Sequence, residues 1–143
     1  MKVLIALDHS EVSTRAAHEA LRLFPGAEFL AINVAQMPVP WVVEGYGAVY
    51  SLPPNWPPPT EELEAALVAD TESAGLVASE LITETGDPAS HICRAADEHD
   101  VDVIVVGAHD KGLWRRLVDP SVSTEVVREA SRPVLVVPER NDD

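Results

Sequence analysis

The strongest constraint on the fold comes from short, uninterrupted apolar runs. Residues 3–7 are all aliphatic, and within the predicted strand 101–107 residues 103–106 are all valine or isoleucine. Such runs lack the polar alternation of a half-exposed strand and are typical of parallel strands buried on both faces. Further strands are predicted at 28–34, 79–85 and 133–137. The chain is therefore expected to form a parallel sheet, which needs helices on both faces.

Amphipathic segments separate these strands and have recognisable helix starts. Ser10 is suited to cap a helix over 11–24, and Thr60-Glu61-Glu62 to start one that reaches residue 78. Asp87-Pro88 begins a helix to about residue 98, and Asp119-Pro120 repeats that start. The side chains expected to face the core are apolar and helically spaced: Val12, Ala16, Ala17, Ala20, Leu21 and Phe24; Leu63, Ala66, Leu67, Ala74 and Val77; Val122, Val126, Val127 and Ala130.

The alternation of strands and helices along residues 1–143 predicts a single α/β domain. Right-handed crossovers make a doubly wound sheet, with helices on both faces, the natural arrangement. Ligands of such folds bind beyond the carboxyl ends of the strands, at the point where the strand order reverses. Candidate binding residues are therefore sought in the turns that follow the strands.

Residues 36–59 do not fit this alternation. They are rich in proline and aromatic residues and contain one charged residue, Glu44. We expect a long loop, a feature that is uncommon in a compact domain and is often functional. Because it follows the second strand, it should emerge at the ligand end of the sheet. It could act as a lid, serve as a docking surface for a partner, or pack its own aromatic side chains over the domain.

The chain is strongly acidic, with a formal charge of −14 at pH 7. A surface of this charge repels nucleic acid and anionic lipid, so we expect neither as a partner. No apolar run reaches the roughly 20 residues of a membrane helix, and no secretory leader is recognised, so a cytoplasmic protein is expected. The single cysteine, Cys93, falls on the apolar side of a predicted helix and is expected to be a buried thiol rather than a redox group.

Four segments carry a recognisable pattern: residues 3–11, the turn 86–88, the run 102–107, and residues 121–123 followed by 132–137. Taken together, in this order and spacing, they resemble the universal stress protein family. The likeness covers nearly the whole chain apart from residues 36–59. It implies a single doubly wound sheet of five parallel strands in the order 3-2-1-4-5, similar to the adenine nucleotide α-hydrolase folds.

The same resemblance implies a homodimer formed through the last strand, from Pro133 to Val137. The residues support this pairing independently, because an apolar strand at the edge of a sheet needs to be paired or covered. A matching strand from a second copy would cover it, and a two-fold axis would close the assembly.

ATP-binding members of the family carry a glycine, two residues, a second glycine, nine residues, then a glycine and a serine or threonine. The corresponding residues here are Gly107, Asp110, Pro120 and Ser121, so the outer two match and the inner two depart. Glycines let backbone N–H groups approach phosphate oxygens at a helix N-terminus. Pro120 has no N–H to donate, and Asp110 would repel a phosphate. Asp119, expected to cap the last helix, would add a second carboxylate.

The adenosine half of the site is expected to be better equipped than the phosphate half. Asp8 and Val34 match the family positions that contact ribose and adenine. The resemblance gives the following candidate contacts for an adenine nucleotide, which could bind with Mg²⁺: Ala6, Asp8, Val34, Gly107, Ser121, Val122 and Ser123. His109 and Asp110 are added as candidate contacts because they follow the fourth strand at the same end of the sheet.

The leading hypothesis is therefore a dimeric, non-enzymatic regulatory module of the stress response, with a degenerate nucleotide site that binds ATP weakly or not at all. A second hypothesis is an ATP- or AMP-binding switch in which Lys111, Arg115 and Arg116 take over the phosphate contacts. The same three cations could equally form ion pairs on a solvated loop.

A third hypothesis is a metal-assisted hydrolase. His9 and His109 follow strands that are neighbours in the implied order, so with Asp8 and Asp110 they would converge at one edge of the sheet. Two imidazoles and two carboxylates could bind a divalent metal or supply general acid–base catalysis. They could also form an ordinary hydrogen-bonded polar loop, and no metal ligands are assigned.

Overall fold

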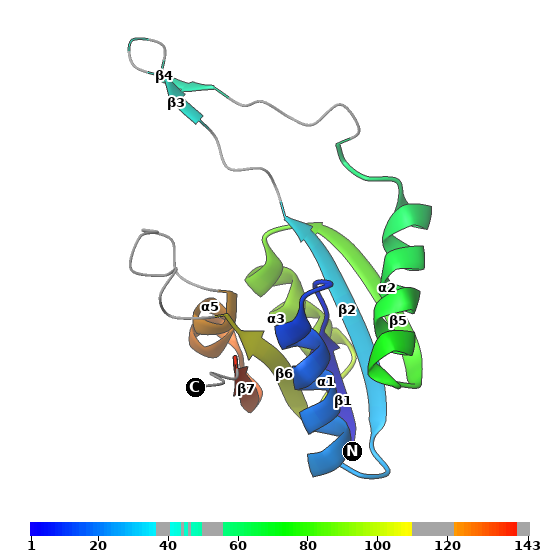
Figure 1. Ribbon diagram of the computed structural model, residues 1–143. Helices are drawn as coiled ribbons and strands as arrows, with labels where there is room; N and C mark the ends of the chain where they lie inside the picture. Colours follow the sequence, from blue (N-terminus) through cyan, green and yellow to red (C-terminus); the bar gives the residue numbers. More distant parts are fainter. Residues whose placement is uncertain (37–40, 44, 46, 50–55, 110–121, 140–143) are drawn as a thin grey trace.

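One parallel sheet organises the described part of the chain. The computed structural model describes residues 1–36, 41–43, 45, 47–49, 56–109 and 122–139 (Figure 1). Within these residues, five strands form a sheet in the order β5-β2-β1-β6-β7, and every pairing is parallel. The strands are β1 (Lys2–Ala6), β2 (Glu28–Gln36), β5 (Ala78–Gly86), β6 (Val103–Ala108) and β7 (Val134–Pro138). The predicted order 3-2-1-4-5 is confirmed.

Helices cover both faces of this sheet, as the doubly wound fold requires (Figure 1). Helices α1 (Glu11–Leu23) and α2 (Thr60–Ala74) lie on one face. Helices α3 (Pro88–Glu98) and α5 (Val122–Glu129) lie on the other. Among the described residues, no helix combines the length and the apolar character that crossing a bilayer requires.

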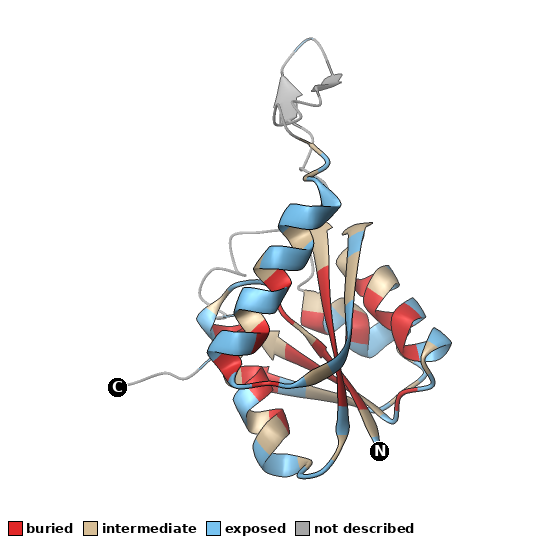
Figure 2. Ribbon diagram, turned by 90° about the vertical axis from the view of Figure 1, so that its right-hand side faces the viewer, coloured by how far each residue is buried: buried red, intermediate tan, exposed pale blue. Residues whose placement is uncertain are grey.

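Strand β1 is buried on both faces, which explains its continuous apolar sequence. Val3 and Ile5 belong to the core cluster beneath α1 and α2, whereas Leu4 belongs to the cluster beneath α3 and α5. Leu4 is flanked in register by Leu30 of β2 and Ile104 of β6. Figure 2 shows this arrangement as buried strands enclosed between helices whose outer sides are exposed. If polar and apolar residues alternated along β1, the side chains on one of its faces would be polar. One of the two core clusters would then lose the apolar side chains that β1 contributes to it.

Two of the predicted helix caps are confirmed. The Ser10 hydroxyl accepts a hydrogen bond from the Ser13 N–H, and the Asp87 carboxylate accepts one from the Ser90 N–H. Pro88 occupies the first turn of α3, where its missing N–H leaves no gap in the helix. The third predicted start, at Asp119-Pro120, lies outside the described residues.

The prediction for α2 was right about where the helix begins but wrong about its cap and its end. Pro59 stands at the N-cap and makes no side-chain cap, so Thr60 lies within the helix. At the other end the helix stops at Ala74, because Gly75 adopts a left-handed conformation with φ of +67°. Glycine enters this region without the steric cost of a Cβ. Val77 therefore lies beyond the helix and is 88% exposed rather than packed in the core.

Helix α5 differs from the prediction at one position. Val126 is fully buried, and Val122 and Ala130 pack against the same core cluster. Val127 was expected to face inward but is 54% exposed. Positions 122, 126 and 130 are four residues apart and share one side of a helix, whereas 127 is rotated away from them.

The expectation of an uninterrupted loop over residues 36–59 was also wrong. Strand β2 continues to Gln36, and β3 (Trp41–Val43) and β4 (Gly47–Val49) form an antiparallel pair of their own. Gly45, in the connection between them, has φ of +89°, which suits a tight reversal. The lid and docking roles considered for this segment stay predictions.

Candidate functional site

A cavity of about 530 Å³ opens at the carboxyl ends of β1, β2 and β6. This is the location at which doubly wound sheets bind their ligands. Seven of the predicted contact residues are described and all line this cavity: Ala6, Asp8, Val34, Gly107, His109, Val122 and Ser123. The other two, Asp110 and Ser121, lie outside the described residues. Contact of these residues with a ligand stays a prediction.

The polar edge of the cavity is built by the turn between β1 and α1. The Ser10 side chain donates to Asp8 Oδ1, and the Ser10 N–H donates to the same oxygen at 3.1 Å. The Asp8 N–H donates to Ser13 Oγ at 3.3 Å. Ser10 also caps α1, so the turn that presents Asp8 is continuous with the start of the helix.

Asp8 is joined across the sheet to the end of β6. His109 Nε2 lies 3.2 Å from Asp8 Oδ2, and both side chains are about half exposed. Burial alone would raise the pKa of Asp8. The hydrogen bonds from the Ser10 hydroxyl, His109 and the Ser10 N–H outweigh it and lower this pKa. Asp8 is therefore an ionised acceptor at neutral pH.

The predicted convergence of Asp8, His9 and His109 holds only in part. His109 pairs with Asp8, but the His9 imidazole turns to helix α2, where its Nδ1 lies 2.5 Å from Asp70 Oδ2. Within the described ranges, no group of three or more histidine, cysteine or acidic side chains could hold a metal ion. Asp110, the fourth member of the predicted cluster, is not among the described residues.

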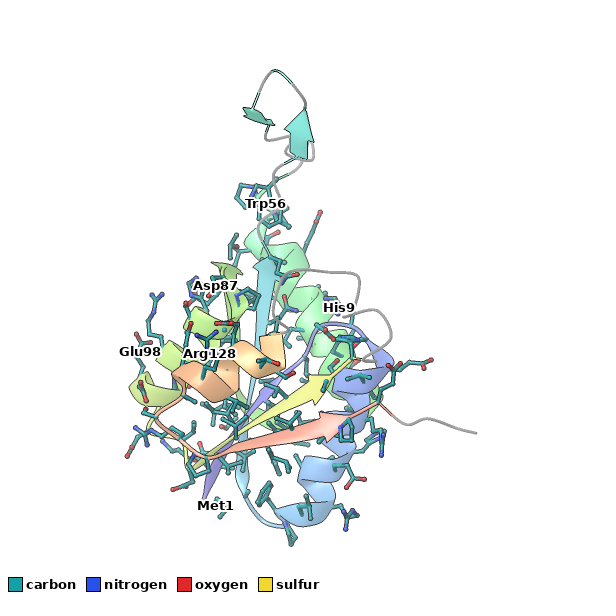
Figure 3. The ribbon with its side chains drawn as sticks, turned by 90° about the vertical axis from the view of Figure 1, so that its left-hand side faces the viewer. Met1, His9, Trp56, Asp87, Glu98 and Arg128 are labelled. Atoms are coloured by element: carbon teal, nitrogen blue, oxygen red, sulfur yellow. The ribbon has the colours of Figure 1, made fainter. Side chains whose placement is uncertain are left out.

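The walls of the cavity are largely apolar. Val34 and Val106 come from the strands, and Ile92 comes from α3. Trp56 and Leu63 line the cavity from the segment that leads into α2 and from the helix itself. Figure 3 places Trp56 and His9 at the same end of the sheet, opposite Met1. A largely apolar cavity with the Asp8 carboxylate at its edge can hold a small, partly polar molecule.

One residue that lines the cavity, Asn33, has a buried side-chain amide. Asn33 is 6% exposed, and its Nδ2 donates to the carbonyl of Leu7 at 2.7 Å. The Leu7 N–H donates in turn to the carbonyl of Ile32 at 2.9 Å. These bonds keep the chain of β1 beside β2 beyond the regular ladder and so position Asp8. Sequence reasoning missed Asn33, although a polar residue within an apolar strand was a usable signal.

Most of the phosphate half of the predicted site falls outside the described residues. Asp119, Pro120, Lys111, Arg115 and Arg116 all lie outside the described residues. The departures from the ATP-binding pattern, Asp110 and Pro120, are therefore known from the sequence alone. Of the four positions in the ATP-binding pattern, Gly107 alone is described, and it lines the cavity.

The family model described as the universal stress protein family matches residues 1–138. The chain belongs to the universal stress protein family.

Two curated relatives agree with this assignment. Universal stress protein MJ0577 of Methanocaldococcus jannaschii is 31% identical over 72 residues, which are 50% of this chain and 44% of the relative. Universal stress protein Sll1654 of Synechocystis is 37% identical over 76 residues, which are 53% and 47%. The matched regions thus span about half the length of these curated relatives.

Solved structures of universal stress proteins share the fold over almost the whole chain. The structure of MJ0577 superposes with a TM-score of 0.68 at 21% identity and covers 99% of this chain and 97% of its own. A universal stress protein in complex with cAMP gives 0.62 at 22% identity, with 96% of both chains covered. A family protein of Arabidopsis thaliana with AMP bound gives 0.62 at 22% identity, covering 100% of this chain and 94% of that one.

Proposed function

We propose that this universal stress protein is a regulatory module that binds the adenosine part of an adenine nucleotide in the cavity between β1, β2 and β6. The observation that carries the proposal is the cavity itself, which combines a volume of about 530 Å³ and largely apolar walls with one carboxylate, Asp8, among the described residues that line it. Cavities of a few hundred Å³ with few, well-placed polar groups are typical of small-ligand sites.

The roles of the individual residues follow from their positions. Asp8, held as an acceptor by Ser10 and His109, would accept hydrogen bonds from ribose hydroxyls or the adenine amine. Val34 and Ile92 would contact the faces of the base. Two structural relatives were solved with cAMP and with AMP, which supports an adenine ligand for this chain.

We propose further that a triphosphate adds little to the binding. Asp110 and Pro120 stand where the ATP-binding pattern has glycines, so the chain lacks an amide donor and adds a carboxylate there. The formal charge of −14 opposes a polyphosphate with or without Mg²⁺. The physiological ligand is therefore expected to be adenosine, AMP or a related small nucleotide.

The module is proposed to act by binding and not by catalysis. The hydrolase hypothesis needed His9 and His109 to act together with Asp8 on one substrate. His9 instead contacts Asp70, on the α2 side of the turn, through both its ring and its backbone N–H. One imidazole is thereby committed to a structural contact.

Isothermal titration calorimetry with adenosine, AMP, cAMP and ATP, with and without Mg²⁺, tests this function. Adenosine and AMP are expected to bind at least as tightly as MgATP. Sub-micromolar MgATP binding, stronger than that of adenosine, would overturn the proposed weakness of the phosphate half. Absence of heat from all four ligands, confirmed by equilibrium dialysis, would overturn the adenosine site.

A pair of substitutions localises the site. Asp8→Asn removes the charge and one acceptor from the cavity edge and is expected to weaken adenosine binding by about tenfold, the equivalent of one charge-assisted hydrogen bond. Asp102→Asn is the matched control, because Asp102 accepts from the Lys2 N–H at the opposite end of the sheet. Equal loss in both variants would count against the role of Asp8.

We propose that two copies assemble through β7. Among the described strands β7 pairs only with β6, and Val136 on it is 37% exposed. Light scattering is expected to give twice the chain mass of 15.4 kDa. Val136→Arg should give monomers, whereas Val127→Arg, a similar change on α5, should leave the dimer intact. A monomeric wild-type protein at high micromolar concentration would contradict this assembly.

A further inference from the structure

The contact between His9, which lines the cavity, and Asp70, which is not among its lining residues, bears on the shape of the cavity's polar edge. His9, between Asp8 and Ser10, has φ of +68°, the left-handed region that side chains with a Cβ rarely adopt. All three residues line the cavity. The direction of the Asp8 carboxylate thus depends on an unfavourable backbone conformation at the next residue, and something must hold that conformation.

Asp70 of α2 is the residue that holds it. The Asp70 Oδ2 atom accepts the His9 backbone N–H at 3.0 Å and lies 2.5 Å from His9 Nδ1. One carboxylate oxygen therefore contacts both the main chain and the ring of the strained residue. The Asp70 side chain is only 15% exposed, which strengthens hydrogen bonds to its charge.

The position of Asp70 is set by the packing of α2. Leu67, one turn earlier, and Ala74, one turn later, are buried against the sheet, so Asp70 lies on the inner side of the helix. Leu63 of the same helix and Trp56 just before it line the cavity directly. Helix α2 thus meets the proposed ligand site at its wall and, through Asp70, at its polar edge.

We infer that Asp70 is a positioning residue for the adenosine site, through which the placement of α2 controls ligand affinity. This inference rests on the proposed function for its ligand. The relation between Asp70 and the turn can be tested without any ligand. Sequence motifs gave no sign of this role, because Asp70 belongs to neither the turn nor the strand ends.

The first experiment compares Asp70→Ala with Asp70→Asn and with Glu64→Ala, an exposed acid of the same helix. Amide hydrogen exchange of His9 is expected to accelerate in Asp70→Ala, to change less in Asp70→Asn, which keeps one acceptor oxygen, and to stay unchanged in Glu64→Ala. Adenosine affinity should fall in the same order, by about tenfold in Asp70→Ala. Unchanged exchange and affinity in Asp70→Ala would overturn the inference.

A second variant separates positioning from general support of the fold. Glycine adopts the left-handed conformation freely, so His9→Gly should make the turn much less dependent on Asp70. In the His9→Gly background, Asp70→Ala is expected to cost adenosine affinity only a small part of what it costs in the wild type. An equal loss in both backgrounds would show that Asp70 acts elsewhere. If the wild type binds no adenine ligand, the proposed function fails, while the exchange rates at His9 still decide whether Asp70 holds the turn.

Discussion

Gly107 at the end of β6 lies directly against Val12 in the first turn of α1. A Cβ placed on Gly107 would stand 2.3 Å from Val12 Cγ1 and 3.0 Å from the Val12 carbonyl oxygen. Van der Waals contact between carbon atoms needs roughly 3.5 Å or more. Glycine at this position is therefore required by the packing of a helix on a strand, whether or not a phosphate binds nearby.

Gly107→Ala is accordingly expected to destabilise the fold. Overpacking of this kind costs typically about 1–3 kcal/mol of unfolding free energy, measured by urea denaturation. Val12→Ala removes the atom in closest conflict, so the double variant should be more stable than the sum of the two single effects predicts. Additivity within about 0.5 kcal/mol would contradict direct contact between these residues.

The cap of α3 makes a pH-dependent contribution to stability. The side-chain hydroxyl of Ser90, and then its N–H, donate to the Asp87 carboxylate and lower the pKa of Asp87 below its ordinary value of 3.8. Its stabilisation is thus present above pH 3.8 and is lost as the pH falls through the lowered pKa. Asp87→Ala should cost about 1 kcal/mol at neutral pH. The difference from wild type should shrink in acid, whereas a constant difference would exclude the ionised cap.

The contribution of the His99–Glu80 pair to stability is expected to have the opposite pH dependence from that of the Asp87 cap. The Ala95 carbonyl, 2.9 Å from His99 Nδ1, and the Glu80 carboxylate, 3.1 Å from Nε2, both accept hydrogen bonds, which raises the pKa of His99 above 6.5. This stabilisation is complete below pH 6.5 and is lost as the pH rises through the raised pKa. His99→Gln should therefore destabilise the protein more at a pH of about 5.5 than at about 8.5. His18→Gln, an exposed histidine of α1, provides the control.

Local signals in the sequence predicted most of the fold. The apolar runs of β1 and β6 and the caps at Ser10 and Asp87 are properties of a few neighbouring residues, and the structure confirms them. The end of α2 was predicted too far along the chain because the apolar pattern continues to Val77, whereas the helix ends before Gly75. Gly75 adopts the left-handed conformation that ends the helix, and the apolar pattern beyond it was too weak to extend the helix further.

The candidate site was predictable where it consists of strand ends. Asp8, Val34 and His109 follow or end neighbouring strands, so the strand order alone brings them to one cavity. Trp56 and Asp70 were not predictable in this way. Their places depend on how α2 lies across the sheet, and that angle is set by side-chain packing over the whole face rather than by a motif.

Cys93 provides a final prediction, about access to the interior. Cys93 is 9% exposed between α3 and α5, and its Sγ lies 3.9 Å from the Val126 carbonyl oxygen. Burial, and after it the nearby carboxylates of Glu129 and Asp97, raises the pKa of Cys93 above 9.0. Since the thiolate is the reactive form, both access and ionisation oppose modification of the native protein.

Reaction with a thiol-specific reagent such as DTNB is expected to be at least a thousandfold slower in the native protein than in urea, on the order of the equilibrium constant for opening a stable domain. One thiol should react per chain after unfolding, because the sequence contains one cysteine. Destabilising variants such as Gly107→Ala should speed the native reaction in proportion to their loss of stability, because modification then samples the open state. Fast labelling of the wild type with no dependence on stability would show instead that the thiol is reached through the native surface, between α3 and α5.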